Sequence, residues 1–167
     1  NIPRNEHAAI RNGTSTYDVA DKWQELIDAL STGQDTITGG TITLCRGKWN
    51  VSKKVSVRTG HGDGLSSVNI IGDGMHSSYV YALPGFTGSS MLELAEPTYC
   101  TLEGLHLFAA ARVPLGLRVM KGSEIIIRDV FAQNATEDGM RFEDNFMMTL
   151  DRLRAKGGVR GFAFDGP

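Results

Sequence analysis

The second half of the chain repeats a short, strand-like apolar pattern every 22 to 25 residues. Leu102, Ile127 and Leu150 occupy the same place in three successive segments, and they lie 25 and 23 positions apart. An internal period of this length indicates a repeat architecture, in which each unit packs mainly on its two neighbours. The period constrains the fold more than any other feature of the chain.

A second set of segments, each opened by a glycine, falls between the first set. Gly116, Gly139 and Gly161 are 23 and 22 positions apart. The apolar residues that follow alternate with a spacing of two, as in Leu117 and Val119, which favours strands and argues against the helical repeats of ankyrin or tetratricopeptide arrays. Each period therefore contains at least two short strands. This pattern predicts an all-β parallel β-helix with 22 to 25 residues per coil, in which successive coils stack at about 4.8 Å.

Bulk composition is compatible with this prediction and excludes several other classes. A chain of 167 residues with 41% hydrophobic residues can bury a core, and a net charge of -2 gives no reason to expect nucleic acid as a partner. No run of 18 apolar residues is present, so we expect no membrane insertion. Cys45 and Cys100 are the only cysteines, and we expect both to be free thiols.

The first part of the chain reads as an arm followed by a helix. Residues 1–15 are polar and without periodicity, so we expect a connector. Val19, Trp23 and Ile27 follow a helical spacing, which predicts an amphipathic helix from Thr16 to about Ser31, capped by Ser15 or Thr16 and followed by Gly33. We assign residues 16–33 to a helix that covers the first coil, with packing on the side of the sheet as the alternative, and residues 34–167 to the coils.

Three motifs between the helix and the repeats carry a family resemblance. They are Gly39–Leu44, the Gly-x-Trp-x-Val element at Gly47–Val51, and Val68–Gly74, which ends in Ile-Gly-Asp-Gly. Together they resemble the N-terminal portion of the pectate-lyase-like right-handed β-helix superfamily, which includes bacteriophage tailspikes and polysaccharide-degrading enzymes. The resemblance implies a right-handed β-helix over about residues 16–166.

Two departures from the family pattern limit what the resemblance implies. Cys45 and Arg46 stand where the family usually has a proline-containing turn, and the sequence ends at Pro167 in the middle of a repeat. A solenoid without a C-terminal cap exposes apolar residues, so we expect further coils, a bound partner or a trimmed chain after Pro167. In family members the catalytic groups often lie on later coils.

Stacking converts repeat position into proximity, which yields candidate site residues. If Leu117 and its equivalents face inward, then Arg118 lies one coil from Arg141, and Glu143 lies one coil from Asp165. Two carboxylates so close favour protonation of one of them, so Glu143 and Asp165 are candidate catalytic residues of a glycosidase-like pair. Arg118 and Arg141 are candidates for binding an acidic sugar. The alternative is an ordinary surface ion-pair ladder.

Other candidate sites are weaker. Tyr79 and Tyr81, in a long insertion expected between coils, are candidate substrate-binding aromatics. Glu137 and Asp138 form an acidic turn that could bind calcium; no other cofactor is expected. The histidines lack metal-ligand spacing, so we expect no metal site. They are His7, His61, His76 and His106.

The resemblance leads to two functional hypotheses. The first is a phage tailspike-like virion protein that binds a bacterial surface polysaccharide, with or without depolymerising it by hydrolysis or β-elimination. The second is a non-catalytic structural or adhesive β-helix of a virion or secreted protein. The resemblance also implies a virion or extracellular location, a homotrimer, and contact with other virion proteins through residues 1–15. If Glu143 and Asp165 are catalytic, Glu143→Gln and Asp165→Asn should each abolish turnover.

Overall fold

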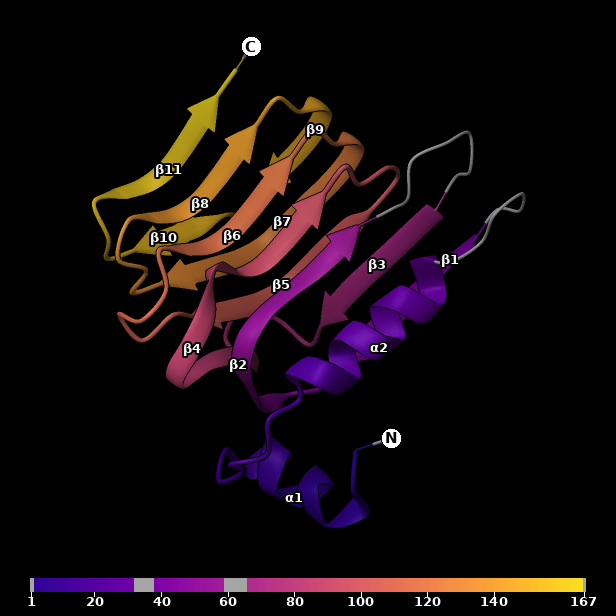
Figure 1. The fold of residues 1–167 in the computed structure, drawn as a ribbon, viewed down its shortest axis with the longest axis vertical. Helices are drawn as coiled ribbons and strands as arrows, with labels where there is room; N and C mark the ends of the chain where they lie inside the picture. Colours follow the sequence, from indigo (N-terminus) through magenta and orange to yellow (C-terminus); the bar gives the residue numbers. More distant parts are fainter. Residues whose placement is uncertain (1, 32–37, 59–65, 167) are drawn as a thin grey trace.

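A computed structural model describes residues 2–31, 38–58 and 66–166 of the chain. Two helices come first and strands follow to the end (Figure 1). The helices are α1 (Arg4–Asn12) and α2 (Ala20–Ser31), and the strands are β1 (Thr38–Leu44), β2 (Gly47–Arg58), β3 (Ser66–Gly72), β4 (Ser78–Ala95), β5 (Thr101–Phe108), β6 (Leu115–Met120), β7 (Ser123–Gln133), β8 (Asp138–Glu143), β9 (Phe146–Asp151), β10 (Arg154–Lys156) and β11 (Arg160–Asp165).

The strands stack in parallel on three faces of a solenoid. The first face contains β1, β3, the start of β5, the start of β7, and β9. The second face contains the start of β2, the start of β4, the ends of β5 and β7, and β10. The third face contains the ends of β2 and β4, then β6, β8 and β11. The parallel β-helix predicted from the repeat is thereby confirmed.

The observed register matches the period read from the sequence. Leu102 pairs with Ile127 and Ile127 with Leu150, as the 25- and 23-residue spacings require. Leu117 pairs with Met140, which in turn pairs with Phe162. Equivalent apolar residues therefore lie directly over one another and form columns through the core.

Each coil has a third strand that the two-strand reading of the repeat did not separate. It arises because the chain bends within β5, within β7 and between β9 and β10, at Gly104, Asp129 and Arg152. These three residues have φ values of 68°, 51° and 49°, a left-handed conformation that glycine adopts readily and other residues adopt less often. The bend turns an apparently continuous apolar run from the first face to the second.

The corner between the second and third faces is much longer in the second coil than in the first. β2 pairs with β4 at Val51 opposite Ala82, then at Lys53 opposite Thr87, and again at Val55 opposite Leu92, with a register shift on each side of Lys53. Residues 83–91 of β4 thus span a corner that residues 52–54 of β2 span in the coil below. The pairing resumes in register after this insertion, so the stack beyond it is undisturbed.

The apolar column on the third face becomes exposed in its last coil. Phe142 is buried, and Phe164 stacks on it with ring centroids 5.0 Å apart. Phe164 is nevertheless 63% exposed and Phe162 is 40% exposed, although both continue inward-facing columns. Within the described residues, no further coil covers these rings.

Helix α2 covers the opposite end of the solenoid, as predicted, and packs on β1, β2 and β3 (Figure 1). Trp23 and Ile27 are buried in the core, whereas Leu26 is largely exposed. The helix begins at Ala20, so the predicted start at Thr16 is wrong. The reason is that the preceding segment is extended: Asp18 forms a parallel bridge with Asn50, and its Oδ1 accepts from the backbone of Ala20. The predicted Gly33 lies outside the described residues.

Side chains of α2 and of the segment before it form hydrogen bonds with backbone groups along the free edge of β2. The carboxamide of Gln24 donates to the carbonyl of Ser56 (2.9 Å) and accepts from its amide (2.8 Å), as a neighbouring strand would. Asp18 accepts in the same way from the amide of Ser52. An exposed strand edge is a site of aggregation, so these contacts both anchor the helix and close the edge.

Residues 1–15 are more ordered than the expected connector arm, because they contain helix α1. Ile10 is buried against the core, and the backbone of Gly47 packs closely on the carbonyl of Ile10, where a Cβ would clash. A single buried residue gives too little periodicity to mark a helix in the sequence. Cys45 and Cys100 are both free, as expected. No helix in the described part of the chain is long and apolar enough to cross a membrane.

The edge contacts of Gln24 lead to a stability prediction. Gln24→Ala removes both hydrogen bonds to Ser56 and one to the exposed Asp28, and it leaves the amide and carbonyl of Ser56 without these partners, so we expect the free energy of unfolding to fall by about 1–2 kcal/mol. Chemical denaturation followed by circular dichroism measures this. Glu25→Ala, on the exposed side of the same helix, is the control; it removes only a surface ion pair with Lys22 and should lower the midpoint much less than Gln24→Ala does. Equal midpoints for both variants would contradict a role of Gln24 in closing the edge.

Candidate functional site

The outer side of the third face carries the charged columns expected from the repeat. Arg118 pairs in register with Arg141, and Glu143 pairs with Asp165. The carboxylate of Glu143 accepts from Arg118 at 2.7 and 3.1 Å, which gives the arginine a partner across the coils. This hydrogen bond is the main reason why the pKa of Arg118 is raised. Asp165 lies exposed on the last described coil.

Two further carboxylates complete this charged ladder. Glu93 is buried and bonds to Lys54 at 2.6 Å, and it lies 3.5 Å from Arg118. The side chain of Asp138 is 1% exposed and bonds to Arg160 at 2.7 Å and to Arg141 at 2.8 Å. Its pKa is lowered, chiefly by the Arg160 hydrogen bond. Both stacked arginines therefore have carboxylate partners within the chain, and an external anion is not required to offset their repulsion.

The acidic turn considered for calcium is part of the same ladder. Asp138 is held by two arginines, and Glu137 lies 3.6 Å from Arg141. Among the described residues, no group of three or more histidine, cysteine or acidic side chains could hold a metal ion. The two carboxylates at this turn therefore have cationic side chains as neighbours in this structure.

Tyr79 and Tyr81 lie on strand β4 and face outward from the second face; they do not belong to a loop insertion. The register places Tyr79 beside His106 and His106 beside Phe131, while Tyr81 lies beside Phe108. We call these five residues the aromatic strip. The strip crosses three consecutive coils.

Ring contacts hold the aromatic strip together. The centroids of Tyr79 and His106 are 4.6 Å apart, and those of His106 and Phe131 are 4.4 Å apart. Tyr81 and Phe108 stack at 5.4 Å with planes inclined by only 9°. Because the rings face one another along the solenoid axis, they present mainly their edges and the two tyrosine hydroxyls to solvent.

Two cations border the aromatic strip. The Nζ of Lys48 lies 4.1 Å from the centroid of the Tyr81 ring, within the range of a cation–π contact. On the next coil, Arg112 donates to the carbonyl of Ala82 at 2.7 Å and places its guanidinium 5.8 Å from the same ring. The strip therefore combines apolar ring edges with hydroxyls and positive charge.

His106 is the buried member of the strip. It is 4% exposed, its Nε2 lies 3.0 Å from Oε1 of Gln133, and its Nδ1 has no hydrogen-bond partner among the described residues. Burial lowers the pKa of His106 to about 4, against the weaker opposing effect of the Gln133 hydrogen bond. The imidazole is therefore neutral at physiological pH.

A polar cavity of about 590 Å³ opens beside Tyr79, and we call it the basic pocket. It lies where the end of α1, the turn before β2 and the turn before β4 meet. Its lining contains three cationic side chains and one carboxylate. The lining residues are Arg11, Asn12, Gly13, Arg46, Gly47, Lys48, Asp73, His76, Ser77 and Tyr79.

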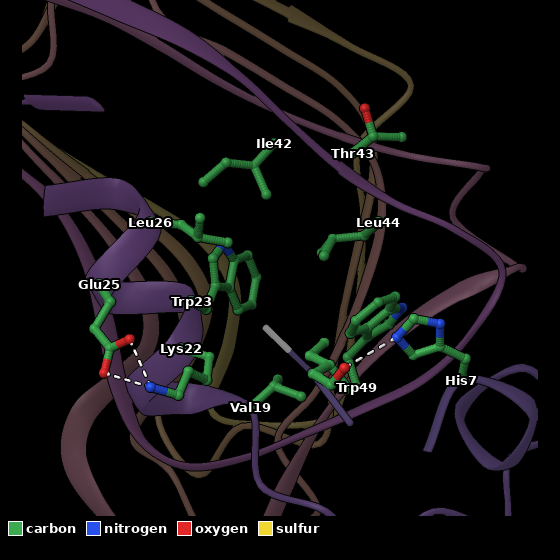
Figure 2. Close-up of a pocket in the computed structure, with 11 residues that line it drawn as sticks. His7, Val19, Lys22, Trp23, Glu25, Leu26, Ile42, Thr43, Leu44 and Trp49 are labelled. Atoms are coloured by element: carbon green, nitrogen blue, oxygen red, sulfur yellow. Dashed lines mark hydrogen bonds and ion pairs between the residues drawn. The ribbon is translucent and has the colours of Figure 1, made fainter. Parts of the chain in front are cut away.

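A second cavity, of about 470 Å³, lies at the capped end of the solenoid. Figure 2 shows apolar side chains from α2 and β1, among them Trp23, Leu26 and Ile42, pointing into it. The pair Lys22–Glu25 and the exposed His7 border it. This cavity marks the imperfect fit between the helical cap and the first coil.

The sequence signalled only part of this arrangement. The aromatic strip is spaced by 27 and 25 residues, from Tyr79 to His106 to Phe131, which is close to the period already recognised. Its members His106, Phe108 and Phe131 were missed because the second face was not recognised as a separate set of strands. The basic pocket has no sequence signal, since its residues come from a helix and two turns.

The buried His106 makes stability depend on pH. Its pKa is about 4 in the folded chain and near 6.5 in the unfolded chain, so the unfolded state binds the proton first as the pH falls. Stability should be fully present above about pH 6.5 and should decrease by about 2–3 kcal/mol as the pH approaches 4. His106→Phe keeps an aromatic ring and should flatten this slope.

Urea denaturation of both proteins at several pH values between 7.5 and 4.5 checks this prediction. His7→Gln, at an exposed histidine, is the control and should keep the slope of the original chain. A slope that His106→Phe leaves unchanged would contradict the assignment of the pH dependence to His106.

Comparison with known proteins finds solved structures that have a similar fold. No protein-family model and no curated protein matches the chain. ORF18 of Geobacillus virus E2 has a similar solved structure, with a TM-score of 0.72 and 13% identity, over 90% of this chain and 30% of that one. A protein described as a putative glycosyl hydrolase from Parabacteroides merdae is similar over 89% of this chain and 73% of its own, with a TM-score of 0.68 and 12% identity.

These two similarities concern architecture. At 12 and 13% identity they show that the chain shares the fold of the viral protein and of the Parabacteroides merdae protein. The chain spans 30% of the length of the viral protein. The chain is therefore a parallel β-solenoid of a type found in both of these proteins.

Proposed function

We propose that this chain is part of a tailspike-like virion protein whose β-helix binds a bacterial surface polysaccharide along the aromatic strip. The observation that carries the proposal is the alignment of Tyr79, His106 and Phe131, which lie in register on three consecutive coils. The fold shared with a protein of Geobacillus virus E2 and with the Parabacteroides protein agrees with it.

The shape of the strip suits a linear, hydroxyl-rich polymer. A solenoid face is rigid and extends along the axis, so its repeated groups can meet repeated groups of a chain. The rings of Tyr81 and Phe108 each cover one face of the other, and Lys48 lies over the Tyr81 ring, so a saccharide would contact ring edges, the tyrosine hydroxyls and the nearby cations Lys48 and Arg112. Aromatic and arginine side chains are common anchors of binding surfaces.

Cleavage by Glu143 and Asp165 has less support than binding. Glu143 is held by Arg118, and the neighbouring carboxylates Glu93 and Asp138 are likewise bound to cations. This pattern is typical of a structural ion-pair ladder, which supports the second candidate function, a non-catalytic adhesive β-helix. We therefore propose that this chain binds the polysaccharide and that Glu143 stabilises the stack through Arg118.

We also propose that the working assembly is a homotrimer and that residues 1–15 contact other virion proteins. Helix α1 exposes polar side chains such as Arg4, Asn5 and His7 while Ile10 anchors it to the core, so it offers a fixed surface to a partner. Sedimentation of the full-length protein tests the trimer, and a stable monomer would contradict it.

Removing a ring from the strip should weaken binding of polysaccharide. We expect Tyr81→Ala to raise the dissociation constant for host surface polysaccharide at least about tenfold, since it removes a ring, a hydroxyl and the cation–π partner of Lys48. Tyr99→Ala removes an exposed tyrosine at a corner of the solenoid and is the matched control. Surface plasmon resonance measures both. Equal affinities for the two variants would exclude the strip as the binding surface.

The catalytic alternative is tested by product analysis. The full-length protein is incubated with host surface polysaccharide, and new reducing ends and unsaturated uronates are assayed. We expect Glu143→Gln and Asp165→Asn to leave any product formation unchanged, because Glu143 is a partner of Arg118 in the ladder. Loss of turnover in both folded variants would instead identify the two carboxylates as catalytic.

A further inference from the structure

The lining of the basic pocket carries more positive than negative charge. Arg11, Arg46 and Lys48 line it together with one carboxylate, Asp73, and its volume of about 590 Å³ is within the range of small-molecule sites. Oδ2 of Asp73 already accepts from the backbone amide of Arg46 at 2.7 Å. The lining therefore has an excess of cations.

The two arginines of the pocket differ from those of the charged ladder. Arg118 and Arg141 each bond to a carboxylate on the same face. By contrast, the side chains of Arg11 and Arg46 form no ion pair or hydrogen bond with any residue that the structure describes. Both side chains are exposed, so their guanidinium groups are available for charge-assisted hydrogen bonds with a bound anion.

The pocket is built on a rigid frame. The amide of Gly47 donates to the carbonyl of Ser77 at 2.8 Å, and the hydroxyl of Ser78 donates to the carbonyl of Leu44 at 2.8 Å. These bonds join the turn before β2 to the turn before β4, one coil above. Lys48 is further held over the ring of Tyr81. A site whose backbone is already fixed loses little entropy when a ligand binds.

Tyr79 joins the pocket to the aromatic strip. It lines the cavity and also contacts His106, so a ligand in the pocket would lie at one end of the strip. A polymer that follows the strip would bring one of its residues to the cations. The positive charge of the pocket, its volume and its continuity with the aromatic strip all favour an acidic saccharide as the ligand.

We propose that the basic pocket binds the acidic group, a carboxylate or a phosphate, of one saccharide unit, with Arg46 and Arg11 as its cationic contacts and Tyr79 against the sugar. The inference rests on the proposed function for the saccharide part of its ligand. According to this inference, the polysaccharide is acidic, and Arg46 forms a charge-assisted hydrogen bond with its acidic group.

The test is a titration of the ¹⁵N-labelled chain with sodium glucuronate, glucose or inorganic phosphate at constant ionic strength. We expect glucuronate to shift the amide signals of Gly13, Gly47 and Ser77, and glucose to shift them far less. Arg46→Gln should weaken glucuronate binding at least about tenfold, because a charged hydrogen-bond partner is lost. Arg58→Gln, which removes one positive charge outside the pocket, should change it less than about twofold.

Several outcomes would overturn the inference. Equal shifts with glucose and glucuronate would show that the acidic group is not recognised, and the absence of shifts with both glucuronate and phosphate would show that the pocket binds no anion. Phosphate binding without glucuronate binding would overturn the carboxylate form of the inference and support the phosphate form. Equal weakening by Arg46→Gln and Arg58→Gln would show only general electrostatic attraction.

The outcomes for the pocket and for the proposed function can be told apart. Host polysaccharide bound equally by the original chain and by Arg46→Gln, without glucuronate shifts, overturns the pocket and leaves the proposed function intact. Glucuronate binding at the pocket in a chain that binds no host polysaccharide supports the pocket and overturns the proposed function.

Discussion

The parallel register between coils is the constraint on which the rest of the structure depends. Each residue lies beside its equivalent in the next coil, about 4.8 Å away, so every position repeats its chemistry along the axis. Inside, this stacks Leu117 on Met140 and Leu102 on Ile127. Outside, it stacks Arg118 beside Arg141, and the hydrogen bonds that Arg118 donates to Glu143 and Arg141 donates to Asp138 offset their repulsion. The same register aligns the aromatic strip.

Much of the fold could be predicted because stacking leaves a period in the sequence. The spacing of Leu102, Ile127 and Leu150 was enough to predict the solenoid and the columns of its first face, and that of Gly116, Gly139 and Gly161 predicted the columns of the third. The second face was missed because its bends at Asp129 and Arg152 use residues that do not mark a left-handed conformation in a sequence; only Gly104 does. Helix α1 was missed because Ile10 alone anchors it.

The candidate site was harder to predict than the fold. Arg118, Arg141, Glu143 and Asp165 were placed correctly relative to one another, but the carboxylate partners of the two arginines depend on side-chain directions that a period does not encode. Tyr79 and Tyr81 were singled out without their neighbours. The pocket depends on the docking of α1, so no reading of the repeat could have assembled it.

The long corner of the second coil shows where this architecture tolerates change. Nine residues, 83 to 91, take the place of the three at 52 to 54 in the coil below, and β4 still returns to register at Leu92. Among the described residues, the corner pairs with its neighbours only where Lys53 lies opposite Thr87 and Ser90 opposite Leu115, and the closure entropy of a connecting segment grows only slowly with its length. Segments grafted at this corner would change the molecule's outline beside the strip while leaving every coil in place. The stack thus separates the part of the protein that must repeat from the part that is free to vary.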